Sequence, residues 1–153
     1  MKWKTTDIDI YFQAKEYVDT ALIPMLPIGW GADVKTTVSL GEFIALFADE
    51  LERQFKGRLV QFPSYTYLKD ESTKTERLQD WIQHLKEEGF KHVILLTSDV
   101  SWKNVEGDLD GVLIWLPVLP LEHVDASYKQ EMLTTQMKQI IQLIMSEWQK
   151  EKE

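Results

Sequence analysis

The side chains best suited to chemistry come directly after the apolar runs of this sequence. Asp99 ends the segment 93–99 and could act as a base or accept a hydrogen bond from a ribose. In residues 29–31, two glycines allow close backbone approach to a ligand, and Trp30 between them offers a stacking face. Ser64 and Tyr65 follow a further apolar run. The candidate ligand-binding residues are Gly29, Trp30, Gly31, Ser64, Tyr65, Ser98 and Asp99.

These residues also have a purely structural interpretation. Residues 29–31 are typical of a turn in which Trp30 anchors the core, and Asp99 could pair with backbone groups. Because placement at strand ends does not by itself identify a function, the structural interpretation is favoured.

Carboxylates also gather between residues 106 and 110, where Asp108 and Asp110 could supply oxygens to Mg²⁺ or Ca²⁺. A calcium loop needs a closing glutamate beyond its glycine, and the residues that follow Gly111 are apolar. Asp and Gly are also the residues that a tight turn requires. We therefore interpret this stretch as a turn and predict no metal ligand in it.

The remaining catalytic signatures are absent from the sequence. His84, His92 and His123 have no HExxH spacing, and no nucleophile elbow or phosphate-binding glycine motif occurs. No catalytic residue is predicted, no cofactor is indicated, and the sequence favours a noncatalytic protein.

Two strongly apolar runs, 93–96 and 112–116, indicate neighbouring strands. A parallel pair would need a crossover of a dozen or more residues, usually a helix, and the polar stretch between these runs has no helical period. The pattern therefore predicts an antiparallel hairpin. Both strands are apolar at consecutive positions, which is typical of a sheet covered on both faces.

Earlier strands at 21–28 and 59–62, the second interrupted at Pro63, alternate with helical segments. The predicted fold is a single α/β domain spanning 1–153. Its small mixed four-stranded sheet has three parallel strands plus an antiparallel C-terminal hairpin strand, with helices on both faces. We expect strand order 2-1-3-4, with the second and third helices on opposite faces. The candidate ligand site would then lie between the first and third strands, at their carboxyl ends.

Helix boundaries follow from capping signals. A first helix is expected over 7–20, and Ser39 with Glu42 has the form of a capping box. A second capping box is Thr73 with Glu76, and Gly89 should stop that helix. The last helix should begin near Asp125 or Ser127, with an apolar stripe that could pack on the sheet or face a partner. The stripe comprises Leu133, Met137, Ile140, Ile141, Ile144 and Trp148.

Composition limits the remaining classes of function. The formal charge of -8 disfavours nonspecific nucleic-acid binding, because an acidic surface repels phosphates. The sequence has no cysteine, which excludes disulfides and thiolate chemistry. No stretch is apolar enough for a membrane span and no signal peptide is evident, so the cytoplasm is the expected location.

The segment 11–21 (YFQAKEYVDTA), followed by Ile23-Pro24 and the strand end Thr97-Ser98-Asp99, resembles the YpiF-like family of uncharacterised proteins from Bacillus and relatives. The resemblance runs over nearly the whole chain. It implies a cytoplasmic bacterial protein and supplies no catalytic residues.

Two functional hypotheses follow from these observations. The leading one is a noncatalytic cytoplasmic protein that acts through protein contacts, as a homodimer or with another protein. The alternative is a small-ligand or nucleotide-binding protein, which could be an enzyme, with its site at the carboxyl ends of the parallel strands.

Overall fold

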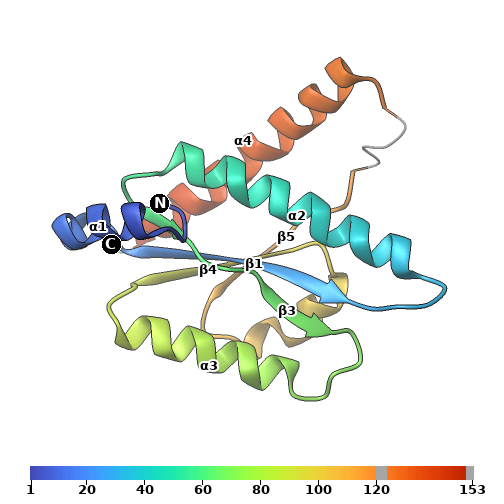
Figure 1. The fold of residues 1–153 in the computed structure, drawn as a ribbon, viewed down its shortest axis with the longest axis horizontal. Coiled ribbons are helices and arrows are strands. Elements are labelled where there is room, and N and C mark those ends of the chain that lie inside the picture. The colour runs from blue at the N-terminus through green and yellow to red at the C-terminus, as the bar shows by residue number, and fades with distance from the viewer. Residues whose placement is uncertain (120–123, 151–153) are drawn as a thin grey trace. The chain divides into compact units, whose positions relative to one another are not determined.

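The computed structural model describes residues 1–119 and 124–150 (Figure 1). His123 lies outside these ranges. The chain divides into two compact units, 1–116 and 117–153, and each is described by itself. The expectation of one domain over the whole chain stays a prediction.

The first unit is built on a parallel sheet. Its strands are β1 (Thr20–Ile28), β2 (Leu59–Gln61), β3 (Tyr65–Leu68), β4 (His92–Thr97) and β5 (Val112–Trp115). Their order is β2-β1-β4-β5, and β3 also pairs with β1, on the stretch beyond β2. The α/β class and the strand order are confirmed. The strand count of four is wrong, because the interruption at Pro63 divides the second strand into β2 and β3.

The predicted antiparallel hairpin is wrong. β5 runs parallel to β4, with Ile94 opposite Val112 and Thr97 opposite Trp115. The crossover is a long 3-10 helix, η2 (Val100–Asp108). A 3-10 helix has three residues per turn, so its sequence does not show the 3.6-residue period of an α-helix. Trp102 of η2 is 1% exposed and shares a core cluster with Ile23 of β1 and Leu95 of β4, so the connection packs against the sheet as a crossover helix would.

Gly111 lies where this crossover returns to the sheet. A Cβ there would be 3.0 Å from the Val93 carbonyl oxygen and 3.3 Å from a methyl carbon of Leu95. A backbone carbonyl in a sheet cannot yield easily, so only glycine lets β5 begin at this distance from β4.

Gly111→Ala should therefore lower the free energy of unfolding by about 1–3 kcal/mol, as overpacking does in other interiors. The matched control is Gly107→Ala in η2, where a Cβ would meet nothing within 4 Å. Urea denaturation of both variants checks this prediction, and equal stabilities would contradict the close approach.

Two helices cover opposite faces of the sheet, as predicted (Figure 1). They are α2 (Val34–Gln54) and α3 (Lys74–Glu87). β4, between the two layers, is buried along its whole length. The buried side of α2 consists mainly of Phe43, Ile44, Phe47, Ala48 and Leu51, and the buried residues of α3 are Leu78, Ile82 and Leu85.

Both predicted capping boxes are wrong. α2 begins at Val34, and the Ser39 hydroxyl donates to the Thr36 carbonyl (3.4 Å) inside the helix. Thr73 does precede α3, but its side chain makes no capping hydrogen bond. The glycine stop is confirmed. Gly89 has φ +108°, and the Phe90 N–H donates to the Leu85 carbonyl (3.1 Å).

The first helix is shorter than predicted. α1 spans Thr5–Gln13 and is followed by a single 3-10 turn, η1 (Lys15–Tyr17). The apolar residues Val18 and Ala21, which completed the predicted helical stripe, instead lead into and form the buried strand β1. None of the α1 side chains is buried.

The second unit contains α4 (Ala126–Lys150). Asp125 caps it as predicted, because its Oδ1 accepts from the Tyr128 N–H (3.0 Å) and the Ser127 hydroxyl (2.8 Å). Ile140, Ile144 and Trp148 of the predicted stripe are buried.

Candidate functional site

Two polar side chains meet at the carboxyl ends of β3 and β4. The Tyr67 hydroxyl donates to Asp99 Oδ2 at 2.7 Å. Asp99 was predicted as a site residue and Tyr67 was not. The available signal was the alternation on β3, where Tyr65 and Tyr67 are both buried and so share a face.

Both carboxylate oxygens of Asp99 accept hydrogen bonds. Its Oδ1 accepts from the Ser101 N–H (3.0 Å) and the Ser101 hydroxyl (2.7 Å), which caps η2. Partial burial acts to raise the pKa of Asp99, but hydrogen bonds from Tyr67 and Ser101 and the nearby Lys74 ammonium outweigh it and lower the pKa. The carboxylate is thus held ionised by hydrogen bonds from Tyr67 and Ser101. A lowered pKa makes it a weaker base, so the arrangement suits a structural role better than that of a general base.

Tyr67 is held as a hydrogen-bond donor. Burial raises its pKa, and the hydrogen bond to the Asp99 carboxylate raises it further. The Lys74 ammonium lies 5.5 Å from the centroid of the Tyr67 ring and 5.6 Å from that of Trp102, and it donates to the Lys69 carbonyl (2.8 Å). The Lys74 ammonium, which comes from α3, therefore lies beside the Tyr67 and Trp102 rings.

Two buried polar atoms near this strand end have no hydrogen-bond partner within the described residues. They are Ser98 Oγ and Trp102 Nε1. The Ser98 carbonyl, by contrast, accepts from Trp115 Nε1 (3.3 Å). Buried polar atoms without partners carry a free-energy cost, so a water or ligand atom would be stabilised beside them.

Of the predicted residues after β1 and β2, Tyr65 packs on this network, with its ring centroid 5.9 Å from that of Tyr67. Trp30 is 90% exposed, so its interpretation as a core anchor is wrong, while Gly31 has φ +111° and forms the expected turn. Ser64 is half-buried. Tyr65 is buried, and its hydroxyl donates to the Lys74 carbonyl (2.5 Å). The structure brings Ser98 and Asp99 to one strand end, places Tyr65 against Tyr67 and Lys74 beside them, and leaves Trp30 exposed to solvent.

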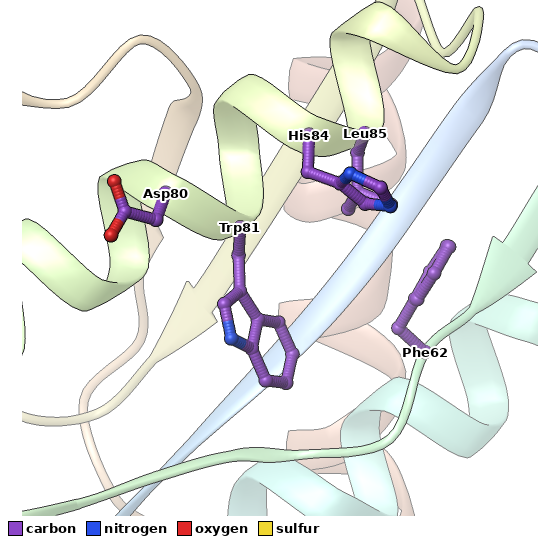
Figure 2. Close-up of a pocket in the computed structure, with 5 residues that line it drawn as sticks. All are labelled: Phe62, Asp80, Trp81, His84 and Leu85. Carbon is purple, nitrogen blue, oxygen red and sulfur yellow. The ribbon is translucent and has the colours of Figure 1, made fainter.

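A cavity that the sequence did not indicate lies between α3 and the segment after β2 (Figure 2). Its volume is about 270 Å³. Trp81 and His84 project from α3, the Phe62 ring lies across the gap, and the Asp80 carboxylate is on the outer side of Trp81. The lining residues are Phe62, Asp80, Trp81, His84 and Leu85.

A second hollow, of about 400 Å³, lies along α1. It is lined by Trp3, Lys4, Thr5, Ile8, Asp9 and Phe12. The Gln61 N–H donates to the Met1 carbonyl (2.8 Å), which places the residues before α1 beside β2. The rings of Trp3 and Phe62 are 4.9 Å apart, so one aromatic pair links the walls of the two hollows.

Large apolar side chains around α1 face solvent. Trp3 is 58% exposed, Ile10 54%, Phe12 61% and Tyr17 67%. We refer to these four residues as the N-terminal aromatic surface. Trp3 and Phe12 line the hollow along α1, whereas Ile10 and Tyr17 are not among its lining residues.

Comparison with known proteins places the chain in a family. The sequence model described as "Protein of unknown function (DUF2487)" matches residues 9–148. The chain belongs to this family. It is also 39% identical over 148 residues to a protein of Bacillus subtilis (strain 168) described as "Uncharacterized protein YpiF", in a match that covers 97% of this chain and 98% of the relative. The predicted family resemblance is therefore confirmed.

No solved structure matches this DUF2487 chain. Within residues 1–119 and 124–150, no three His, Cys, Asp or Glu side chains are grouped so that they could hold a metal ion. None of the helices in these ranges has the length and apolar character needed to cross a bilayer.

Proposed function

We propose that this DUF2487 protein is a noncatalytic cytoplasmic protein that acts by binding another protein through its N-terminal aromatic surface. The observation that carries the proposal is α1, a helix that buries none of its residues and exposes Ile10 and Phe12 to solvent. α1 meets the core through the partly buried Tyr11, whose ring stacks on Phe90 with 6.4 Å between the centroids. Ile10 and Phe12 stay exposed, and an apolar partner surface would supply their missing burial.

The composition of this surface supports the same proposal. Aromatic side chains are enriched at the centres of protein interfaces, where each buries a large area with few rotatable bonds. Phe12 also lines the 400 Å³ hollow beside Trp3, so the surface is concave as well as apolar. The hydrogen-bonded state of Asp99 supports a noncatalytic role, because the best candidate base is already engaged.

A photo-crosslinking amino acid at position 12 tests this proposal in living cells. We expect a discrete crosslinked protein product at position 12, which disappears when Trp3 and Ile10 are replaced by serine. The matched control is the same amino acid at Tyr128, an aromatic residue of α4 that is 54% exposed. The crosslinked partner could be a second copy of this chain. Light scattering of the purified protein over a range of concentrations would then show a dimer. A strict monomer with no product specific to position 12 would contradict the proposal.

A second candidate is a small-ligand or nucleotide site at the strand ends, formed by the residues predicted from the sequence. Its support is the buried Ser98 Oγ, which has no partner within the described residues and could be satisfied by a ligand atom. A thermal-shift screen with nucleotides and metabolites tests it. We expect stabilisation by at least one compound that Ser98→Ala weakens, and the absence of any stabilising compound would contradict this candidate.

A further inference from the structure

The cavity between Phe62 and Trp81 has the size of a single side chain. Its volume of about 270 Å³ lies below the range of about 300–1,000 Å³ that is usual for small-molecule sites. Its inner wall is Leu85, and its sides are the two aromatic rings. A partner side chain could therefore bury an apolar stem here and leave a polar end at the mouth.

Both aromatic walls are held in place by other rings. Phe62 lies 4.9 Å from Trp3 and 5.5 Å from Phe90, edge to face with the latter. Trp81 packs edge to face on Tyr65, with the ring centroids 5.3 Å apart. The walls are thus organised before anything binds, which reduces the entropy lost on binding.

The charges beside the cavity favour a cationic occupant. Two cations of α3 form ion pairs, Arg77 with Glu71 (2.8 Å) and Lys86 with Asp110 (3.1 Å), and the His84 side chain lines the cavity itself. Asp80 has no ion-pair partner within the described residues, and its carboxylate lies on the side of Trp81 away from Phe62 (Figure 2). A basic segment approaching this protein of formal charge -8 would therefore find one unpaired carboxylate, that of Asp80, within a side-chain rotation of the cavity.

We propose that this cavity receives an arginine side chain from a basic segment of a partner protein. The three methylenes of arginine would lie between Phe62 and Leu85, and the guanidinium would stack on Trp81 at the mouth, within reach of a rotated Asp80 carboxylate. The inference rests on the proposed role in protein contacts and names the chemistry of the partner.

Titration of the full chain with the peptide acetyl-Gly-Ala-Arg-Ala-Gly-amide, followed by NMR of the tryptophan indole N–H groups, tests this proposal. Trp81→Phe identifies which of the six indole signals belongs to Trp81. We expect that signal to move with a Kd of roughly millimolar order, as for one stacked cation. The lysine peptide should bind more weakly, and the citrulline and norleucine peptides should leave the signal in place.

Two variants locate the site. Asp80→Asn should weaken binding about two- to fivefold, the loss expected for one exposed charge contact, and is not expected to disturb the fold. Trp81→Leu removes the indole, so binding to this variant is followed at the backbone amide of Phe90. That amide signal should move with peptide in the unaltered protein and stay in place in Trp81→Leu. Glu88→Gln is the control, because it removes the same charge from the end of α3 without lining the cavity, and it should change binding less than twofold.

Equal shifts with the citrulline or norleucine peptide, or equal weakening by Asp80→Asn and Glu88→Gln, would overturn the arginine assignment. An unmoved Trp81 signal at about 20 mM peptide would overturn the site itself. If the peptide fails but the crosslink at position 12 persists, only this inference falls. If the peptide binds and no crosslinked product or dimer is found, only the proposed role of the N-terminal aromatic surface falls.

Discussion

Trp102→Ala is expected to lower the free energy of unfolding by about 3–5 kcal/mol, the loss typical of truncating a large buried aromatic side chain. Trp102 is 1% exposed and contacts the Tyr67 ring edge to face, with 5.1 Å between the centroids. Removing the indole would leave a cavity beneath η2, the segment that makes β5 parallel to β4. The loss therefore measures how strongly the crossover is anchored to the sheet.

Chemical denaturation followed by circular dichroism checks this result. The matched control is Trp30→Ala, the same substitution at a residue that is 90% exposed, which should change stability by less than about 0.5 kcal/mol. Trp102→Phe should cost less than Trp102→Ala, because it keeps an aromatic ring in the buried position. Similar losses at positions 30 and 102 would contradict the buried position of Trp102.

Asp99→Ala should lower the free energy of unfolding by about 2–4 kcal/mol at neutral pH. It leaves the buried Tyr67 hydroxyl without its acceptor, which costs about 1–3 kcal/mol, and it removes the cap of η2, which costs about 0.5–2 kcal/mol. Asp110→Ala is the control, because Asp110 is exposed and forms only a surface ion pair with Lys86.

The effect of Asp99 should depend on pH with a definite sign. The pKa of Asp99 in the folded protein is lowered relative to that of the unfolded chain, near 3.9. Its ionised form therefore stabilises the fold fully above the unfolded pKa, and this contribution is lost as the pH falls through the folded pKa. Denaturation is measured at several pH values between neutral and strongly acidic. The difference in free energy of unfolding between the unaltered protein and Asp99→Ala should become smaller in acid. A constant gap would show that ionisation of Asp99 is not involved.

Tyr67→Phe completes a double-mutant cycle with Asp99→Ala. We expect the two losses to be less than additive, because the second substitution removes a contact that the first has already broken. Strict additivity would contradict a direct Tyr67–Asp99 hydrogen bond.

The strand order and the two helical layers could be predicted because they follow from the hydrophobic period and the sequence of elements. Strand-helix-strand units pair in parallel with right-handed crossovers, which leaves few arrangements for β1, β2 and β4. Gly89 ended α3 as predicted, since a positive φ at that position selects glycine. The capping boxes at Ser39 and Thr73 could not be predicted from spacing, because a serine or threonine inside or beside a helix can bond elsewhere.

The candidate site could be predicted only in part. The sequence located Asp99 at a strand end, but not Tyr67 as its partner, because that contact joins residues 32 positions apart. The cavity at Trp81 depends on Phe62 of another element, and neither residue type nor spacing links the two before the chain folds.

The sequence by itself determined the α/β class, the family and the positions of four apolar strands, since these depend on local patterns of apolar residues. Only the tertiary structure decided the direction of β5. An apolar run forms a strand in either direction, and the choice depends on the path of the connection before it. Burial of Trp102 and the close approach of Gly111 to Val93 make that connection a crossover, and both are contacts between distant segments.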